Sequence, residues 1–99
     1  MRGLPAIVVV GLTLAAAGCD GTRIPAAATL ATDPGEVAAL DQGRTLYLSR
    51  CSGCHALIQP AAKSPREWPG EVALMAKRAK IDAAQRAAIT AYLVRAAQR

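Results

Sequence analysis

The sequence has few of the residues from which most active sites are built. Its 99 residues include one histidine, one tryptophan, two tyrosines and no phenylalanine. No Ser-His-Asp set, no pair of carboxylates placed for acid–base work and no glycine-rich phosphate loop can be recognised. We therefore expect that the protein is not an enzyme.

Cysteine is also scarce, but two of the three cysteines lie beside the single histidine. Residues 51–55 read Cys-Ser-Gly-Cys-His. This spacing is typical of covalent attachment of a c-type haem, whose two vinyl groups bond to the thiols while the histidine binds the iron. The motif predicts one haem c held by Cys51 and Cys54, with His55 as an axial ligand of the iron.

Other uses of a Cys-x-x-Cys pair fit less well. A thioredoxin-like redox pair requires a βαβ context, and the sequence shows none. A structural zinc site requires a second pair of ligands, whereas only Cys19 remains and there is no further histidine. A plain disulfide loop in an exported protein stays open as the alternative.

The N-terminus predicts export. Arg2 precedes an apolar run over residues 4–17, which is too short for a confident transmembrane span and ends in small residues. We interpret residues 1–18 as a signal peptide. Its end, Ala-Ala-Gly-Cys, resembles a bacterial lipobox, in which cleavage leaves the cysteine as a lipidated first residue. That residue would be Cys19.

Lipidation would account for the third cysteine and would also predict where in the cell the protein is located. Two acyl chains suffice for stable anchoring in a bilayer. Asp20 follows Cys19, and in similar lipoproteins an aspartate there is associated with retention at the inner membrane. We expect a location at the periplasmic face of the bacterial inner membrane. The alternative is ordinary secretion to a soluble periplasmic form, with Cys19 as an additional thiol.

The rest of the chain divides into a spacer and one domain. Residues 19–32 show no amphipathic period and contain glycine, proline and several alanines, so we expect a lipidated cysteine followed by a flexible tether. The domain would occupy residues 33–99. Its first helix is expected to start after the capping residue Asp33, with proline next in line, and to run to the haem cysteines.

Two more helices are expected after the haem motif. A capping pattern begins at Ser64, but Pro69 would clash with the preceding turn of a continuous helix. We therefore expect a short turn over 64–68 and a helix from Pro69 to about Lys80. A third helix should follow the capping pattern at Asp82 and end near Ala97. The sequence predicts an all-α fold.

The stretch from Gly43 to His55 resembles the first helix and haem site of class I cytochromes c. The resemblance covers residues 33–99 and implies a fold of three main helices around one covalently bound haem. It also implies that Gly43 and Tyr47, which share a helical face, cross against an aromatic residue of the last helix, here Tyr92. Without the resemblance, Gly43 can also be a tolerated weak point of its helix.

A second ligand of the iron is expected in the helix after the haem motif. Trp68, Val72, Met75 and Ala79 share one face of that helix. The pattern resembles small bacterial cytochromes c in which a methionine follows a tryptophan by seven residues. By that resemblance Met75 binds the iron opposite His55, and Trp68 covers the haem or donates its indole N–H to a propionate.

The alternative roles of these two residues are structural. Methionine and tryptophan commonly fill protein cores. If Met75 is such a residue, the sixth position of the iron is open, holds water, or takes a lysine such as Lys63. An open position would favour a different function, that of a haem-based gas or redox sensor.

Charge suggests the kind of partner. The net charge is +5, and basic residues cluster in sequence on the side expected to face away from His55, at Lys63, Arg66, Lys77, Arg78, Lys80 and Arg86. Such a rim would steer redox partner proteins with acidic surfaces, although a solvated surface is the plainer account. Nucleic acid is not an expected partner of an exported lipoprotein. We expect a membrane-tethered electron carrier, either a shuttle or a subunit of a larger oxidoreductase.

Overall fold

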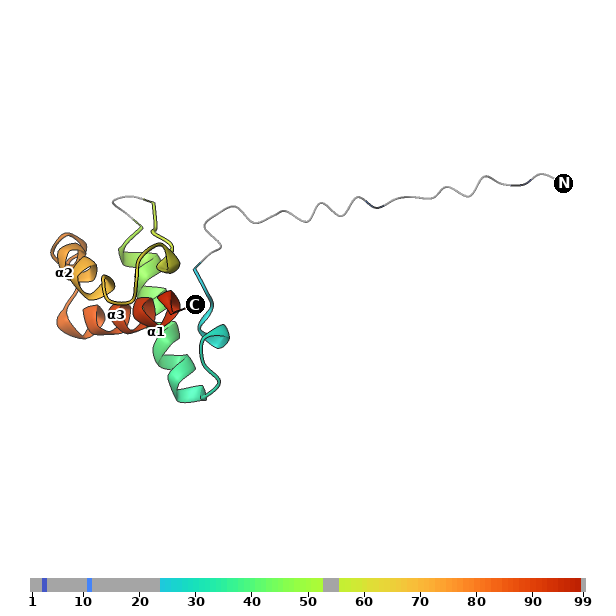
Figure 1. Cartoon of the computed structure of the whole chain (residues 1–99), viewed down its shortest axis with the longest axis horizontal. Helices are drawn as coiled ribbons and strands as arrows, with labels where there is room; N and C mark the ends of the chain where they lie inside the picture. The colour runs from blue at the N-terminus through green and yellow to red at the C-terminus, as the bar shows by residue number, and fades with distance from the viewer. Residues whose placement is uncertain (1–2, 4–10, 12–23, 53–55, 99) are drawn as a thin grey trace.

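The computed structural model describes residues 24–52 and 56–98, together with Gly3 and Gly11. Three α-helices occur in this part of the chain, α1 (Pro34–Arg50), α2 (Trp68–Ala79) and α3 (Ala83–Ala97) (Figure 1). Two short 3₁₀ helices, η2 (Ala27–Thr29) and η3 (Pro60–Ala62), accompany them. No strand occurs among the described residues, so the predicted all-α class is confirmed.

Several predicted features lie outside the described residues. They are the signal peptide apart from its two described glycines, the lipidation site Cys19, and the haem-motif residues Cys54 and His55. Within the described ranges, no helix combines the length and the apolar character needed to cross a bilayer.

The helices begin where side chains cap them. A carboxylate oxygen of Asp33 accepts a hydrogen bond from the backbone N–H of Glu36 at 3.0 Å, and proline occupies the first turn of α1. Asp82 and Gln85 form a reciprocal capping box at the start of α3. The predicted limits of these two helices are confirmed.

The turn before α2 is also confirmed. A carboxylate oxygen of Glu67 accepts from the backbone N–H of Ser64 at 3.0 Å, which closes the turn. α2 then begins at Trp68, one residue before the predicted Pro69. The helix ends at Ala79, because the capping residue Lys80 has a left-handed φ of 53° that does not continue the helix.

α1 and α3 approach each other closely at Gly43. A Cβ atom at this position would overlap the carbonyl oxygen of Ala88 and would lie 2.8 Å from the Cβ of Tyr92. Glycine is therefore required by packing, and the expected contact between Gly43 and Tyr92 is confirmed. The cost of a glycine inside a helix is offset because it lets the two backbones approach each other.

Aromatic residues occupy the centre of the core. Tyr47 of α1, Trp68 of α2 and Tyr92 of α3 are all fully buried. The rings of Tyr47 and Trp68 meet edge to face, with their centroids 6.2 Å apart. Each of the three helices thus contributes one aromatic side chain to a single core.

The segment before α1 differs from the expected flexible tether. Ile24, Ala27, Leu30 and Ala31 are buried in the core. Residues 24–32, called the strap below, lie along α1 (Figure 1). The folded part thus begins by Ile24 and not at Asp33, so the expectation of a flexible spacer is wrong for residues 24–32.

Side chains of the helices hold the strap through its backbone. The Tyr92 hydroxyl donates to the carbonyl oxygen of Pro25 at 2.5 Å. The guanidinium of Arg95 donates to the carbonyl oxygen of Leu30 at 2.7 Å. The guanidinium of Arg44 donates two hydrogen bonds of 3.3 Å to the carbonyl oxygen of Ile24. Apart from the short η2 the strap has no helix of its own, so these bonds satisfy carbonyl groups that burial would otherwise leave unpaired. Such long-range partners leave no periodic pattern in the sequence.

The crossing at Gly43 gives a test of the fold. We expect Gly43→Ala to lower the free energy of unfolding by about 1–3 kcal/mol or more, because the added methyl group forces the backbones of α1 and α3 apart. Gly70→Ala is the matched control, since nothing lies within 4 Å of a Cβ at that position. It should leave stability unchanged or raise it by up to about 1 kcal/mol. Urea unfolding followed by circular dichroism measures both, and equal effects of the two changes would contradict the packing argument.

Candidate functional site

A cleft lies between the C-terminal end of α1 and one side of α2. Its volume is about 300 Å³, at the lower end of the range of about 300–1,000 Å³ for small-molecule sites. Its lining residues come from these two elements and are Arg50, Cys51, Glu71, Leu74, Met75, Arg78 and Ala79. The cleft thus brings together Cys51 and Met75, two of the predicted haem-binding residues.

Cys51 is positioned by the end of α1. It caps the helix, and its backbone N–H donates to the carbonyl oxygen of Tyr47 at 3.1 Å. The residue is 6% exposed, so it is largely shielded from solvent at the edge of the cleft. Because Tyr47 is anchored in the core one turn earlier, the position of Cys51 follows from the packing of α1.

Met75 lies on the predicted face of α2. Trp68 and Val72 are buried on that face, and Met75 and Ala79 are half-buried further along it. Met75 packs against the core and also lines the cleft. The neighbouring Leu74, by contrast, is 72% exposed. The thioether is therefore at the boundary between core and cleft, where it can contact a ligand in the cleft.

Trp68 has a different place from the one expected for a haem-binding residue. Its side chain is fully buried and does not line the cleft. Its indole N–H donates to the carbonyl oxygen of Pro60 at 2.9 Å. In the structure, then, Trp68 has the core-packing role that was the alternative, and its single donor is engaged within the protein.

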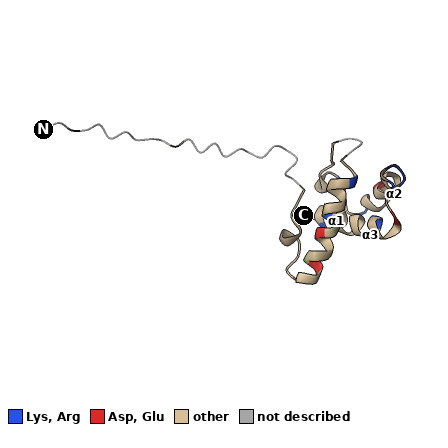
Figure 2. Ribbon diagram, turned by 180° about the vertical axis from the view of Figure 1, so that it is seen from behind, with Lys and Arg blue, Asp and Glu red and all other residues tan. Residues whose placement is uncertain are grey.

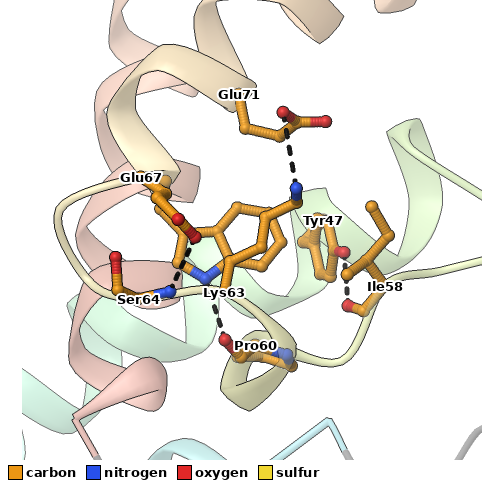
Figure 3. Close-up of polar contacts among 8 residues, drawn as sticks. Tyr47, Ile58, Pro60, Lys63, Ser64, Glu67 and Glu71 are labelled. Atoms are coloured by element: carbon orange, nitrogen blue, oxygen red, sulfur yellow. Dashed lines mark hydrogen bonds and ion pairs between the residues drawn. The ribbon is translucent and has the colours of Figure 1, made fainter.

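Tyr47 and Trp68 together hold the loop that follows the Cys-x-x-Cys-His motif. The Tyr47 hydroxyl donates to the carbonyl oxygen of Ile58 at 2.6 Å (Figure 3), and the indole N–H of Trp68 donates to the carbonyl oxygen of Pro60. Lys63 adds an ion pair with Glu71 of α2, with nitrogen and oxygen 3.7 Å apart (Figure 3). The chain is thus fixed on both sides of residues 53–55, by α1 before them and by these contacts after them.

The charge at the cleft comes mainly from two arginines. Arg50 and Arg78 line it together with Glu71. Of the basic residues predicted to form a rim, only Arg78 is among the lining residues, and Lys63 is paired with Glu71. Arg50 was missed in the sequence, although its position directly before Cys51 is a signal that could have identified it.

The described residues by themselves form no metal centre. In the described part of the chain, no group of three or more His, Cys, Asp or Glu side chains is close enough to hold an ion. An iron site here would depend on His55, which lies outside the described residues.

Comparisons with known protein families, with curated proteins and with solved structures gave no match.

The Tyr47 hydroxyl gives a pH-dependent test of the loop contact. Burial raises its pKa from the ordinary value of 10.0 to about 12, and the nearby Cys51 adds to the rise. Since the pKa is higher in the folded protein, the contribution to stability is complete below pH 10 and is lost as the pH rises toward 12. We expect the free energy of unfolding of the wild type to fall more steeply over this interval than that of Tyr47→Phe.

Denaturant unfolding at a series of pH values measures the two slopes. Tyr47→Phe keeps the ring that packs on Trp68 and removes only the ionisable group. The pKa of Tyr92 is also raised by burial, but that residue is present in both proteins and cancels in the comparison. Equal slopes would show that the Tyr47 hydroxyl is not protected by the fold.

Proposed function

We propose that this protein transfers electrons through one covalent haem c, with a cytochrome c-like arrangement of its helices. Cys51 and Cys54 would carry the haem, and His55 and Met75 would bind the iron. The observation that carries the proposal is that Cys51, the first residue of the Cys-x-x-Cys-His motif, shares a cleft with Met75.

The residues around the cleft fit such a group. A thiol at its edge can bond to a vinyl group, and a thioether at its boundary with the core is a common second ligand of haem iron. Leu74 and Ala79 supply apolar lining for the porphyrin. The guanidinium groups of Arg50 and Arg78 are suited to carboxylates such as the two propionates.

The haem supplies reversible one-electron oxidation and reduction at iron. The chain's own residues determine how that chemistry is used. A thioether from Met75 would favour the reduced state, and with it a higher potential. Tyr47, Trp68 and Val72 are fully buried, and Met75 packs against the core that they belong to. Water would therefore be limited on the core side of a Met75 ligand, which suits electron transfer better than turnover of a substrate.

The proposed setting is the periplasmic face of the bacterial inner membrane. The support is the signal-like N-terminus, the lipobox-like sequence ending at Cys19 and the aspartate that follows it. The proposed partners are redox proteins with acidic surfaces, supported by the net charge of +5 and by two arginines at the cleft.

The visible spectrum of the protein, made in a host that attaches haem c, tests the proposal. We expect a red protein whose haem stays bound on a denaturing gel and is lost from a Cys51→Ser/Cys54→Ser variant. The oxidised protein should show the weak far-red band of a methionine–iron bond. Met75→Ala should abolish that band and lower the reduction potential.

Leu74→Ala is the matched control for Met75→Ala. The two residues are adjacent in α2 and both line the cleft, but only Met75 offers a ligand atom. The control should retain the far-red band. A colourless protein would overturn the haem assignment in favour of a disulfide loop. A high-spin wild type that readily binds carbon monoxide would instead favour the sensor function.

A further inference from the structure

The strap changes how far the domain can reach from a lipid anchor. Five residues lead from Cys19 to Ile24, which at full extension span at most about 18 Å. Had the whole segment to Asp33 been a flexible spacer, fourteen residues could have spanned about 50 Å. Docking of the strap therefore shortens the maximum reach nearly threefold.

The strap also determines which side of the domain is tied to the anchor. It contacts α1, and side chains of α1 and α3 hold it. α2 lies on the other side of α1 from the strap, and this holds in both views of the molecule (Figures 1 and 2). The cleft, which lies between the end of α1 and α2, is thus on the side away from the point of attachment.

We propose that the strap holds the domain close to the bilayer by the side of α1 opposite α2, so that the cleft faces a partner protein whose docking surface stands clear of the lipid headgroups. Because the segment between the lipidated cysteine and the strap is short, the side of the domain to which it is attached stays nearest the membrane. This inference rests on the proposed lipidation of Cys19, and it adds the direction in which the redox site is presented.

Both buried side chains and hydrogen bonds attach the strap to the helices. Four of its side chains are buried, and three separate helix residues donate to its carbonyl oxygens. Two of those donors are guanidinium groups, whose charged hydrogen bonds are stronger than neutral ones. The anchor-proximal end is also held, because Arg44 donates twice to the carbonyl oxygen of Ile24 and Tyr92 donates to that of Pro25.

The test measures which side of the domain is nearer the lipid. The full lipidated chain is reconstituted in vesicles of phosphatidylethanolamine and phosphatidylglycerol that contain a nickel-chelating headgroup lipid. A nitroxide label is placed on Asp41→Cys in α1, one turn before Arg44, or on Lys77→Cys in α2, both exposed positions. We expect nickel to enhance relaxation of the label several-fold more at position 41 than at position 77. Vesicles without the chelate correct for any iron in the protein.

Release of the strap should remove the difference. Arg44→Ala/Tyr92→Phe/Arg95→Ala deletes all three donors while keeping the ring of Tyr92 in the core. We expect the ratio of relaxation between the two label positions to fall toward one in this variant. Arg86→Ala is the control and should keep the ratio of the wild type, because Arg86 is an exposed residue of α3 and is not one of the three residues that donate to the strap. Circular dichroism of each variant checks that the helices are intact.

The outcomes separate this inference from the proposed function. Equal relaxation at the two positions, or stronger relaxation at position 77, would overturn the orientation and would indicate that the cleft faces the membrane. A protein that does not partition into vesicles would overturn the lipid anchor and the inference with it. Neither result would affect the haem assignment, which the visible spectrum tests separately.

Discussion

The close crossing of α1 and α3 at Gly43 is the contact on which the rest of the structure depends. The two backbones approach so closely that even a methyl group does not fit between Gly43 and Ala88. This approach brings Tyr92 against α1 and allows Tyr47, one turn further along, to be fully buried. Cys51 follows one turn later, so the first cysteine of the motif is positioned by a chain of contacts that starts at a glycine.

The second feature is the use of buried aromatic residues as hydrogen-bond donors. Tyr47 and Trp68 pack edge to face in the core, and each donates to a backbone carbonyl of the loop after the motif. Leu57 and Ile58 of this loop also pack against the core. The loop is thus held both by two of its side chains and, through the aromatic pair, by its backbone. Tyr47 and Trp68 act on the site through the loop and through α2, without lining the cleft.

The strap on the N-terminal side is likewise held by side chains that donate to its backbone. Three donors from α1 and α3 bind carbonyl oxygens of a segment that has almost no helix of its own. For a small domain this adds apolar core that the helices by themselves lack. If Cys19 is lipidated as proposed, docking of the strap also shortens the free segment between the anchor and the domain. Stability and the presentation of the proposed redox site would then be coupled through the same few contacts.

Much of the fold could be predicted from local sequence. The caps at Asp33 and Asp82 and the proline pattern before α2 act within four residues, so they can be recognised without knowledge of the fold. The shared face of Trp68, Val72 and Met75 follows from the period of a helix. The Cys-x-x-Cys-His motif is equally local, because its spacing reflects the ligand chemistry of one short segment.

The tertiary structure decided what depends on distant partners. The burial of the strap needs donors some twenty to seventy residues away, at Arg44, Tyr92 and Arg95, and no periodic pattern records such pairings. The place of Trp68 depends on a carbonyl at Pro60 that only the folded loop presents to it. The meeting of Cys51 and Met75 at one cleft likewise follows from how α1 and α2 pack on α3. The sequence by itself determined the helices, because their signals are local, and for the same reason it predicts the chemistry of the motif. Three-dimensional packing alone decided which side chains line the cleft and along which side of the domain the strap lies.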